Sequence, residues 1–511
     1  MNKRNLVLSC ATLSLIAITA CVEQPTERYV TSCAFPADAT TAQKVRMAAH
    51  VVPSKRQLDW QKMEYTCFIC YGINTFTDRE WGTGKEDPKL FDPSALDTDQ
   101  WVKTAKDAGM KMILLTCKHH DGFCLWPSKE TDFSVAASPW KGGKGDLVKD
   151  VAESCKKQGL KFAVYLSPWD MNHPDYGTEK YNDVFVNQLT ELLTQYGTVD
   201  EVWFDGACGE GPNGKKQVYD FERYYSVIRK LQPNAVIAVM GPDVRWVGTE
   251  SGYGRDTEWS VIPASAANLK QIANTSQQES GTGTFLPEGD KMAKDLGSSA
   301  LLEKANGVMW YPSEVDVSIR PGWYYHAAQD TLVKSPQKLI DIYYSSIGKN
   351  SLLLLNLPPD KRGVIHENDV HSLMEMERIL DKTFETNFFN TPQTNITSDI
   401  AVSDLTDETL ETYWSGTDSS NELAFTLAKE ATVDRLMIQE NITEGQRIES
   451  FVFEYWNGSS WVEAAKGTTI GFKRLLRFAP VTSNRFRIVV LESRDTPQIS
   501  EFGIFKASKE E

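Results

Sequence analysis

Residues Val199–Gly206 read V-D-E-V-W-F-D-G, a short apolar strand that ends in a carboxylate, Asp205, directly before a glycine. A second run, Met112–Trp126, reads M-I-L-L-T-C-K-H-H-D-G-F-C-L-W and places a histidine pair, His119 and His120, at the end of another apolar strand. Barrel enzymes keep catalytic groups at the C-terminal ends of their strands. The two runs therefore predict one shared pocket at the ends of parallel strands.

From about residue 60 to residue 359, short apolar strands alternate with amphipathic helices, which is typical of parallel β/α units. The number of units favours a (β/α)8 barrel over a doubly wound sheet, and no glycine-rich phosphate loop follows the first strand. The predicted strands are Tyr65–Tyr71, Met112–Thr116, Lys161–Leu166, Glu201–Phe204, Ala235–Met240, Gly307–Tyr311 and Ser351–Leu355. The predicted helices include Asp97–Ala108, Asp146–Gln158 and Asp183–Tyr196.

The C-terminal part of the chain has a different pattern, in which alternating segments are separated by turns such as Asn457-Gly458. This pattern predicts an antiparallel β-sandwich, with strands at Arg435–Gln439, Ser450–Tyr455, Arg474–Phe478 and Arg485–Val490. We therefore expect an α/β fold in which a (β/α)8 (TIM) barrel over 51–365 is followed by a helical connector, 366–394, and a sandwich, 395–511. The stretch Asn268–Asp295, rich in Ser, Gly and Gln, is predicted to be a long loop or insertion.

The N-terminus has the features of a targeting signal. Lys3 and Arg4 precede the apolar run Leu6–Ile18, and the segment closes with I-T-A-C at Cys21, which resembles a bacterial lipoprotein signal. We expect a signal peptide over 1–20, lipid attachment at Cys21, a linker over 21–50, and an extracytoplasmic protein anchored to a bacterial membrane, with the outer membrane favoured. A plain secretory signal or a membrane helix is the alternative, although the run is shorter than the ~20 residues that a span needs.

Composition limits the classes of function. At 511 residues the chain is longer than one core usually supports, so two domains are expected. The net charge is -15, with no basic face, and a nucleic-acid partner is therefore not expected. Cys67 and Cys70 form a C-x-x-C, but at this spacing on a strand their side chains face opposite sides, which argues against a zinc or redox site.

Asp205 alone fits a helix cap, a metal ligand or a nucleophile. The histidine pair adds specificity, because two imidazoles can address different parts of one polar ligand. A metal site is the rival interpretation, and it would need a further carboxylate or histidine at matched spacing. A hydrolase that uses no metal needs a second carboxylate, which acts as an acid while the first attacks.

Five runs together closely resemble glycoside hydrolase family 29, the retaining α-L-fucosidases. They are F-I-C-Y-G-I-N-T-F-T-D-R-E-W-G (68–82), K-H-H-D-G-F-C-L-W (118–126), Y-L-S-P-W-D (165–170), V-W-F-D-G (202–206) and S-L-L-L-L-N-L-P-P (351–359). The resemblance covers roughly residues 55–365 and implies a (β/α)8-like catalytic domain, no catalytic metal or cofactor, and Asp205 as the nucleophile. A trailing sandwich is usual in that family, and here the runs 412–417, 453–461 and 499–505 resemble a discoidin-like domain.

The acid/base assignment rests on D-V-R-W-V-G-T-E (243–250), which resembles the subfamily acting on α-1,3- and α-1,4-linked fucose of Lewis-type glycans. In that pattern Glu250 is the acid/base, with Glu258 and Glu314 as reserves, and the expected reaction is a double displacement with retention. The expected substrate is a fucosylated oligosaccharide or glycoconjugate. By resemblance, the residues that hold the fucose hydroxyls and wall the pocket are Glu80, Trp81, His119, His120 and Tyr165. The aromatic candidates for the methyl face are Trp126, Trp246 and Trp323.

The chain departs from that family at Cys70, where the pattern F-x-H-[FWY]-G carries a histidine that hydrogen-bonds the sugar. A thiol is a weak donor, and a buried hydroxyl left unpaired costs about 1–3 kcal/mol. Cys70 is thus expected in the substrate site, and attenuated or altered activity stays open. Two alternatives remain: a non-hydrolytic surface glycan-binding lipoprotein, and a retaining glycosidase for a related sugar such as α-L-galactose.

Overall fold

A computed structural model describes residues 30–263, 294–417 and 420–511. The predicted signal peptide, the lipid-attachment residue Cys21 and all but the last two residues of the predicted loop Asn268–Asp295 lie outside these ranges. Within them, no helix combines the length and the apolarity that a bilayer crossing requires.

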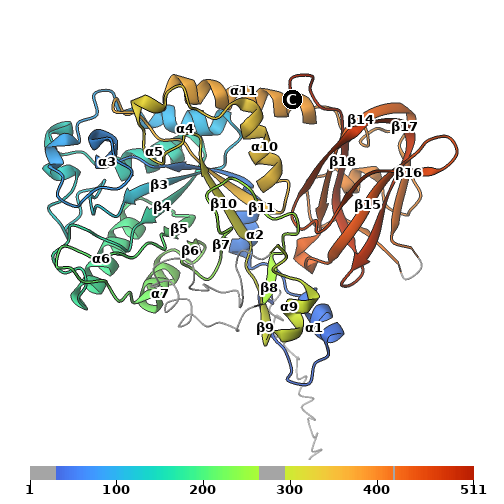
Figure 1. Cartoon of the computed structure of the whole chain (residues 1–511), viewed down its shortest axis with the longest axis horizontal. Helices are drawn as coiled ribbons and strands as arrows, with labels where there is room; N and C mark the ends of the chain where they lie inside the picture. Colours follow the sequence, from blue (N-terminus) through green and yellow to red (C-terminus); the bar gives the residue numbers. More distant parts are fainter. Residues whose placement is uncertain (1–29, 264–293, 418–419) are drawn as a thin grey trace, which may run out of the picture.

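Eight parallel strands form a nearly closed barrel, which confirms the predicted fold class (Figure 1). Seven of the eight neighbouring pairs share a ladder, and a single parallel bridge between Ala238 and Val244 links the eighth pair. In their order around the barrel the strands are β2 (Tyr65–Ile69), β3 (Met112–Lys118), β4 (Lys161–Leu166), β5 (Glu201–Phe204), β6 (Val236–Val239), β7 (Arg245–Trp246), β10 (Ser313–Ser318) and β11 (Ser351–Asn356).

Alternation along each strand divides the core into two layers. On β5, Val202 and Phe204 belong to the cluster that packs under the outer helices, whereas Trp203 belongs to the cluster inside the barrel. Because successive side chains on a strand point to opposite faces, Asp205 continues the inward series. The same rule separates Cys67, in the outer cluster, from Cys70, in the inner one.

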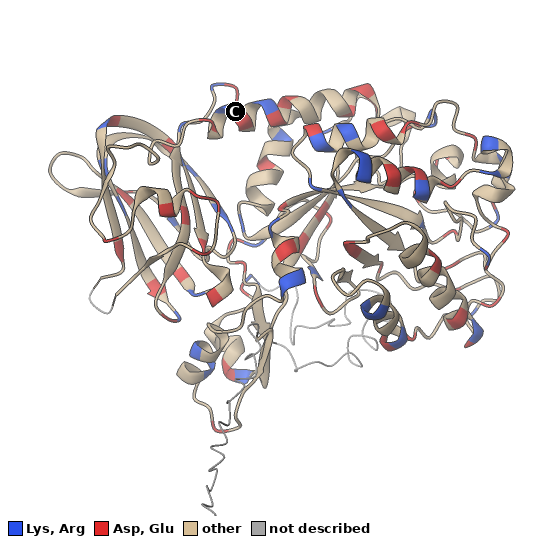
Figure 2. Ribbon diagram, turned by 180° about the vertical axis from the view of Figure 1, so that it is seen from behind, with Lys and Arg blue, Asp and Glu red and all other residues tan. Residues whose placement is uncertain are grey.

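Helices cover the outside of the barrel (Figure 1). Aspartate side chains cap the predicted helices at Asp97 and Asp146, where each accepts from the backbone N–H three residues later. The covering helices are α4 (Thr98–Asp107), α5 (Leu147–Gln158), α6 (Lys180–Gln195), α7 (Phe221–Leu231), α10 (Pro336–Ser346) and α11 (Glu367–Phe384); α2 (Lys55–Gln61) and α3 (Ile73–Thr77) flank the first strand. Acidic and basic residues are interspersed along these helices rather than gathered by sign (Figure 2).

Two expectations about the chain outside the barrel strands are corrected. The apolar run Gly307–Tyr311 is not a barrel strand, because it forms β9 (Gly307–Trp310) in a separate antiparallel sheet with β1 (Ser32–Ala34) and β8 (Val261–Pro263). The stretch expected to be a linker, 21–50, holds β1 and α1 (Thr41–Ala48) where it is described, because β1 pairs with β9. Helix α9 (Ser299–Lys304) completes this small unit, which projects from the junction between the two domains (Figure 1).

The C-terminal domain is an antiparallel β-sandwich, as predicted. The predicted strands Arg474–Phe478 and Arg485–Val490 are two parts of one strand, β17 (Arg474–Ser493), which pairs with β14 (Glu422–Glu440) across two register shifts. Its core is rich in phenylalanine, with Phe453 and Phe486 stacked at 5.7 Å. The remaining strands are β12 (Asn395–Ile396), β13 (Trp414–Ser415), β15 (Ile448–Trp456), β16 (Trp461–Gly467) and β18 (Gln498–Phe505).

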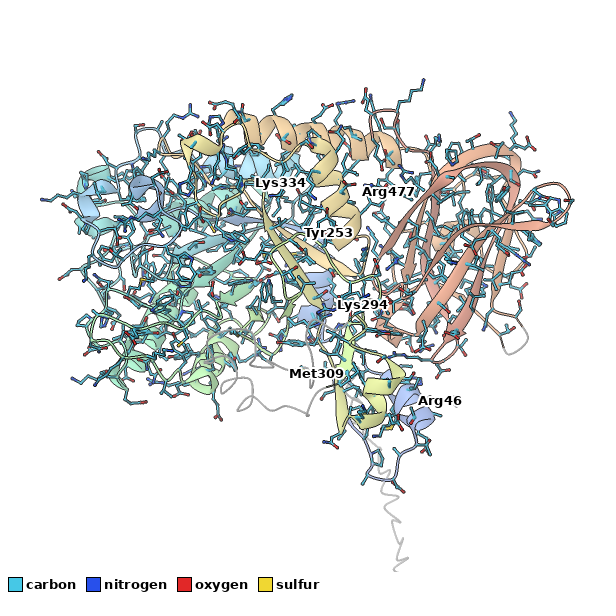
Figure 3. All side chains as sticks on the ribbon, viewed as in Figure 1. Arg46, Tyr253, Lys294, Met309, Lys334 and Arg477 are labelled. Carbon is cyan, nitrogen blue, oxygen red and sulfur yellow. The ribbon has the colours of Figure 1, made fainter. Side chains whose placement is uncertain are left out.

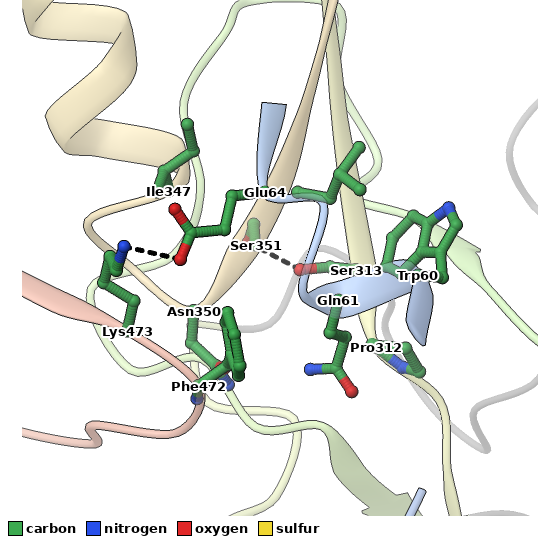
Figure 4. A pocket seen from close by; sticks show the side chains of 11 residues that line it. Trp60, Gln61, Glu64, Pro312, Ser313, Ile347, Asn350, Ser351, Phe472 and Lys473 are labelled. Carbon is green, nitrogen blue, oxygen red and sulfur yellow. Dashed lines mark hydrogen bonds and ion pairs between the residues drawn. The ribbon is translucent and has the colours of Figure 1, made fainter. Parts of the chain in front are cut away.

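The sandwich packs directly on the barrel. Arg477 points from the sandwich toward α10, where it donates to Asp341 Oδ1 at 2.7 Å and lies 3.9 Å from the centre of the Tyr344 ring (Figure 3). A cavity of about 10 Å³ lies in the same interface, between Trp60 and the Glu64–Lys473 ion pair (Figure 4). That volume is close to the minimum for one water molecule, so this cavity cannot hold a sugar.

Candidate active site

The ends of β3 and β4 are joined by a buried ion pair. Lys118 Nζ donates to Asp170 Oδ2 at 3.1 Å and to Tyr181 and Gln188 at 2.9 Å each. Lys118 begins the K-H-H-D run and Asp170 ends the Y-L-S-P-W-D run, so the pair fixes two sequence motifs against each other. A register shift at the end of β3 re-aims the residues that follow, as β-bulges commonly do beside active sites.

Asp205 stands at the end of β5, with its side chain about a quarter exposed. Its Oδ1 accepts from the Ala207 N–H at 2.7 Å, and its Oδ2 accepts from the Tyr165 hydroxyl at 3.0 Å. Tyr165 is in turn stacked on Trp203 at 5.1 Å. The carboxylate is therefore held in one orientation while part of it faces solvent, as a nucleophile requires.

His120 presents an acceptor nitrogen toward Asp205. The Ser167 hydroxyl donates its one proton to the Trp169 carbonyl at 2.7 Å, so it must accept from His120 Nδ1, also at 2.7 Å. Burial, with a contribution from Lys118, lowers the pKa of His120 to about 3. The ring is thus neutral, and its Nε2, 3.8 Å from Asp205 Oδ2, has a lone pair for a substrate hydroxyl.

His119 lies beside His120, with ring centres 4.1 Å apart, and stacks on Tyr165. Burial lowers its pKa well below the usual range, and His120 adds to the effect. Its Nδ1 is buried and has no hydrogen-bond partner among the described residues. Burial also raises the pKa of the neighbouring Asp121 to about 7. His119 and His120 therefore form a neutral polar surface at the strand ends.

Cys70 lies where the sequence predicts it, inside the barrel near Asp205. The thiol is 3% exposed and accepts from the Thr116 hydroxyl at 3.6 Å, while its backbone N–H donates to Asn356 Oδ1. Burial raises the pKa of the thiol far above its ordinary value, with smaller contributions of the same sign from Glu80 and Asp205. Cys70 is thus a neutral, weakly polar group rather than a thiolate nucleophile.

Glu250 lies on the loop after β7 and is exposed. The indole Nε1 of Trp323 donates to Glu250 Oε2 at 3.1 Å. The neighbouring Trp246 uses its indole differently and donates to the buried Asp316 at 2.7 Å. Burial raises the pKa of Asp316 well above its ordinary range, with the Glu250 carboxylate adding to the shift. A buried carboxyl whose charged form is disfavoured thus lies near the exposed carboxylate.

Glu80 and Trp81 occupy the loop after β2. Glu80 Oε2 accepts from the backbone N–H of Trp323 at 2.8 Å, and its Oε1 contacts His326 Nε2 at 2.6 Å, so protein groups engage both oxygens. Trp81 is 54% exposed and packs edge-on against His120 at 5.3 Å and against Trp169 at 5.6 Å. An exposed ring beside buried histidines suits contact with a sugar face.

Three predicted residues are not brought to this cluster. Trp126 is fully buried in the outer core, where its Nε1 donates to Glu191 on α6. Glu258 is buried between Arg245 and Arg255. Glu314 is buried inside the barrel, where it accepts from Trp203 at 2.7 Å. Neither reserve carboxylate is accessible, whereas Glu250 is exposed.

Sequence reasoning missed four residues of this region: Ser167, Trp169, Asp316 and His326. Ser167 and Trp169 belong to the Y-L-S-P-W-D run, whose position at a strand end was the available signal. Asp316 is two residues after Glu314 on β10 and shares its face. Within the described ranges, no three His, Cys, Asp or Glu side chains are arranged to hold a metal ion.

Comparisons with known proteins place this geometry in context. Residues 42–385 match the family described as Alpha-L-fucosidase. The chain is 41% identical over 468 residues to alpha-L-fucosidase 1 of Arabidopsis thaliana, covering 89% of this chain and 87% of the plant protein. It is similar to a Bacteroides ovatus structure described provisionally as an alpha-L-fucosidase, with a TM-score of 0.84, 50% identity, and coverage of 94% and 78% of the two chains. A Ruminococcus gnavus glycoside hydrolase 29 fucosidase in complex with fucose gives a TM-score of 0.76 at 30% identity, with coverage of 90% and 96%.

Proposed function

This chain belongs to the α-L-fucosidases of glycoside hydrolase family 29 and is a glycoside hydrolase, and from that premise we propose that it is a retaining exo-enzyme that releases terminal α-1,3/1,4-linked L-fucose from Lewis-type glycans. The observation that carries the proposal is that Asp205 and Glu250 are both accessible carboxylates. Asp205 is fixed by Tyr165 and Ala207 at a strand end, and Glu250 is held by Trp323 on the loop after β7.

In the proposed first step, an Asp205 oxygen attacks the anomeric carbon and Glu250 gives its proton to the leaving oxygen. In the second step, Glu250 takes a proton from water, which attacks the same carbon and releases fucose with retained configuration. The neutral rings of His119 and His120, together with Tyr165 and Glu80, hold the sugar hydroxyls, and Trp81 forms a wall beside them. The hydrogen bond from the Tyr165 hydroxyl to Asp205 Oδ2 restricts rotation of the carboxylate, which supports its role as the nucleophile.

Linkage preference is proposed from the run 243–250, whose last residue is Glu250. The reserves Glu258 and Glu314 are both buried, which supports Glu250 as the acid/base. Trp246 and Trp323 flank the same loop and are proposed to contact the sugar. The sandwich is proposed to be of the discoidin-like type.

A further part of the proposal is which sugar the site binds. Cys70 and Thr116 form a small, weakly polar pair close to Asp205, so the site is proposed to bind fucose with one hydrogen bond fewer than an imidazole would supply. α-L-galactose, which differs from fucose by a C6 hydroxyl, is the second substrate to be assayed.

We also propose that the enzyme is an extracytoplasmic lipoprotein, anchored through Cys21 to a bacterial outer membrane. The support is the sequence: Lys3 and Arg4, the apolar run Leu6–Ile18, and I-T-A-C. Labelling of expressing cells with a clickable fatty acid tests this proposal. Label in the full chain but not in Cys21→Ser is expected, and equal label in both would contradict it.

The decisive assay uses the purified chain lacking residues 1–20. Lewis a and Lewis x trisaccharides are expected to release fucose faster than 2′-fucosyllactose, and 4-nitrophenyl α-L-fucoside is expected to react faster than its α-L-galactoside. NMR during the first turnovers should show α-fucose before mutarotation. Initial β-fucose would contradict retention, and preference for the α-1,2 linkage would contradict the proposed specificity.

A further inference from the structure

An ion-paired histidine outside the groups assigned above bridges two loops at the mouth of the barrel. His326 Nδ1 lies 2.7 Å from Asp78 Oδ1, and its Nε2 lies 2.6 Å from Glu80 Oε1. Each ring nitrogen thus lies within hydrogen-bond distance of one carboxylate oxygen. Asp78 and Glu80 come from the loop after β2, whereas His326 comes from the segment after β10.

Glu80 also contacts the backbone of Trp323. Its second oxygen, Oε2, accepts from the Trp323 N–H at 2.8 Å. A Cβ at position 322 would collide with Glu80 Oε1, so Gly322 permits the close approach of the carboxylate. On the other side, Asn356 Nδ2 donates to the Trp323 carbonyl at 2.8 Å. The peptide groups on both sides of the Trp323 Cα are therefore fixed.

Trp323 connects this fixed backbone to the exposed carboxylate of Glu250. Its indole Nε1 donates to Glu250 Oε2 at 3.1 Å, and its ring packs on Phe68 at 5.8 Å. Glu250 itself lies on an irregular loop, and its side chain is exposed. The position of the indole thus restricts where this carboxylate can lie.

We propose that His326 is a positioning residue for the general acid: by bridging Asp78 and Glu80 it holds the backbone of Trp323, and the Trp323 indole holds Glu250 where it protonates the leaving oxygen. This inference rests on the proposed assignment of Glu250 as the acid/base. His326 itself touches no substrate in this mechanism. Its removal should therefore weaken acid catalysis more than any other part of the reaction.

The distinguishing readout is the dependence on the leaving group. A good leaving group departs without a proton, whereas a poor one needs the general acid. The value of kcat/KM reports the first chemical step, so it is measured for 4-nitrophenyl and for phenyl α-L-fucoside. A histidine that only stabilised the fold, or only shaped the sugar site, would affect both substrates equally.

The test compares His326→Ala with wild type and with His50→Ala. His50 is a matched control, because its imidazole also contacts a carboxylate, Asp495 at 2.8 Å, but on α1's side of the molecule. His326→Ala is expected to lose about tenfold in kcat/KM on phenyl fucoside and less than about threefold on the 4-nitrophenyl compound, a part of the 10²–10⁴-fold that general acids contribute. His50→Ala is expected to match wild type on both.

Two further variants separate the possible failures. Trp323→Phe keeps the ring but removes the indole donor, and it is expected to show the same leaving-group dependence even if His326→Ala does not fold. Glu250→Ala is expected to show the largest dependence. If Glu250→Ala shows none, the acid/base assignment and this inference both fail. If Glu250→Ala shows it but His326→Ala and Trp323→Phe lose activity equally on both substrates, or lose none, only the positioning role is overturned.

Discussion

Replacing Glu201 with glutamine should change how the stability of the barrel depends on pH. Glu201 and Glu314 are both fully buried inside the barrel. Glu201 Oε2 accepts from Trp60 Nε1 and Glu314 Oε1 accepts from Trp203 Nε1, each at 2.7 Å. The two remaining oxygens, Glu201 Oε1 and Glu314 Oε2, are buried and have no hydrogen-bond partner among the described residues, and each carboxyl group shifts the pKa of the other. Two carboxylates in contact cannot both be ionised, so the pair holds at least one proton.

The size of the effect follows from the retained proton. Burial raises the pKa of Glu201 from 4.5 to about 8, and it raises that of Glu314 as well, with Glu201 adding to the second shift. Between pH 4.5 and about 8 the native state therefore holds a proton on Glu201 that the unfolded chain releases. Stability therefore falls as pH rises, by about 1.4 kcal/mol per pH unit for one proton. From pH 5.5 to 7.5 the loss is about 3 kcal/mol.

Glutamine keeps the pairing without needing the proton. Its carbonyl accepts from Trp60 and its amide donates to Glu314. The free energy of unfolding of Glu201→Gln relative to wild type should therefore rise by about 3 kcal/mol between pH 5.5 and 7.5. Urea unfolding followed by tryptophan fluorescence measures this, and the difference cancels other buried acids such as Asp121 and Glu440.

A matched control is Glu191→Gln, because Glu191 also accepts from a buried indole, that of Trp126 at 2.8 Å. It lies in the outer core, and its other oxygen accepts from the Lys129 N–H rather than facing a second carboxyl. It therefore tests whether the change with pH requires a second buried carboxyl group. Parallel pH curves for Glu201→Gln and wild type would refute the shared proton.

Three further predictions concern single side chains. Tyr165→Phe removes the hydroxyl that donates to Asp205 Oδ2, so kcat/KM on 4-nitrophenyl fucoside should fall about tenfold, since a hydrogen bond to a charged group contributes about 1.5–3 kcal/mol; an unchanged rate would show that this bond does not orient the nucleophile. Cys70→His should raise kcat/KM on both an aryl fucoside and a Lewis trisaccharide, provided that the ring fits beside Thr116; a lower rate on both would mean that Cys70 belongs to a remodelled specificity. Glu258→Gln leaves two buried arginines with a weaker partner, so thermal unfolding should begin several degrees lower while the ratio of rates on phenyl and 4-nitrophenyl fucoside stays at the wild-type value; a changed ratio would make Glu258 part of the acid catalysis.

The sequence was sufficient for the strands that are mostly apolar on both their inward and outward faces. Strand β3 reads M-I-L-L-T-C-K, and an apolar run bounded by helices predicts a buried parallel strand. Strand β10 reads S-E-V-D-V-S, and its inward positions are Glu314 and Asp316, each of which accepts from a tryptophan indole. No local pattern marks such a strand as buried, because its partners come from β5 and β7.

The apolar run at 307–311 was predicted to be a barrel strand and is not one. It is as apolar as a barrel strand, but β1 and β8 cover it in a separate sheet. Periodicity reports that a strand is buried and does not report which sheet buries it. Strand β7, with two residues, is too short to produce any periodic signal.

Some residues of the candidate site could be predicted from the sequence, and others could not. Asp205, His119 and His120 follow strands directly, so their place at the strand ends could be predicted from the chain. Trp126 ends the same run as the histidines, yet it turns outward to bond Glu191 on α6, a partner that is 65 residues away. His326 could not be identified as a site residue from its neighbours in the sequence, because its contacts are with Asp78 and Glu80, about 250 residues earlier in the chain.

In the proposed mechanism Asp205 attacks the anomeric carbon, and trapping the covalent intermediate tests this step most directly. A 2-deoxy-2-fluoro-α-L-fucosyl donor with a good leaving group should inactivate the enzyme and add one fluorofucosyl group per chain, detected by intact mass. After pepsin digestion the added mass should lie on the peptide that contains Asp205, and Asp205→Asn should not be labelled. Label on any other carboxylate, or undiminished turnover in Asp205→Asn, would contradict the account.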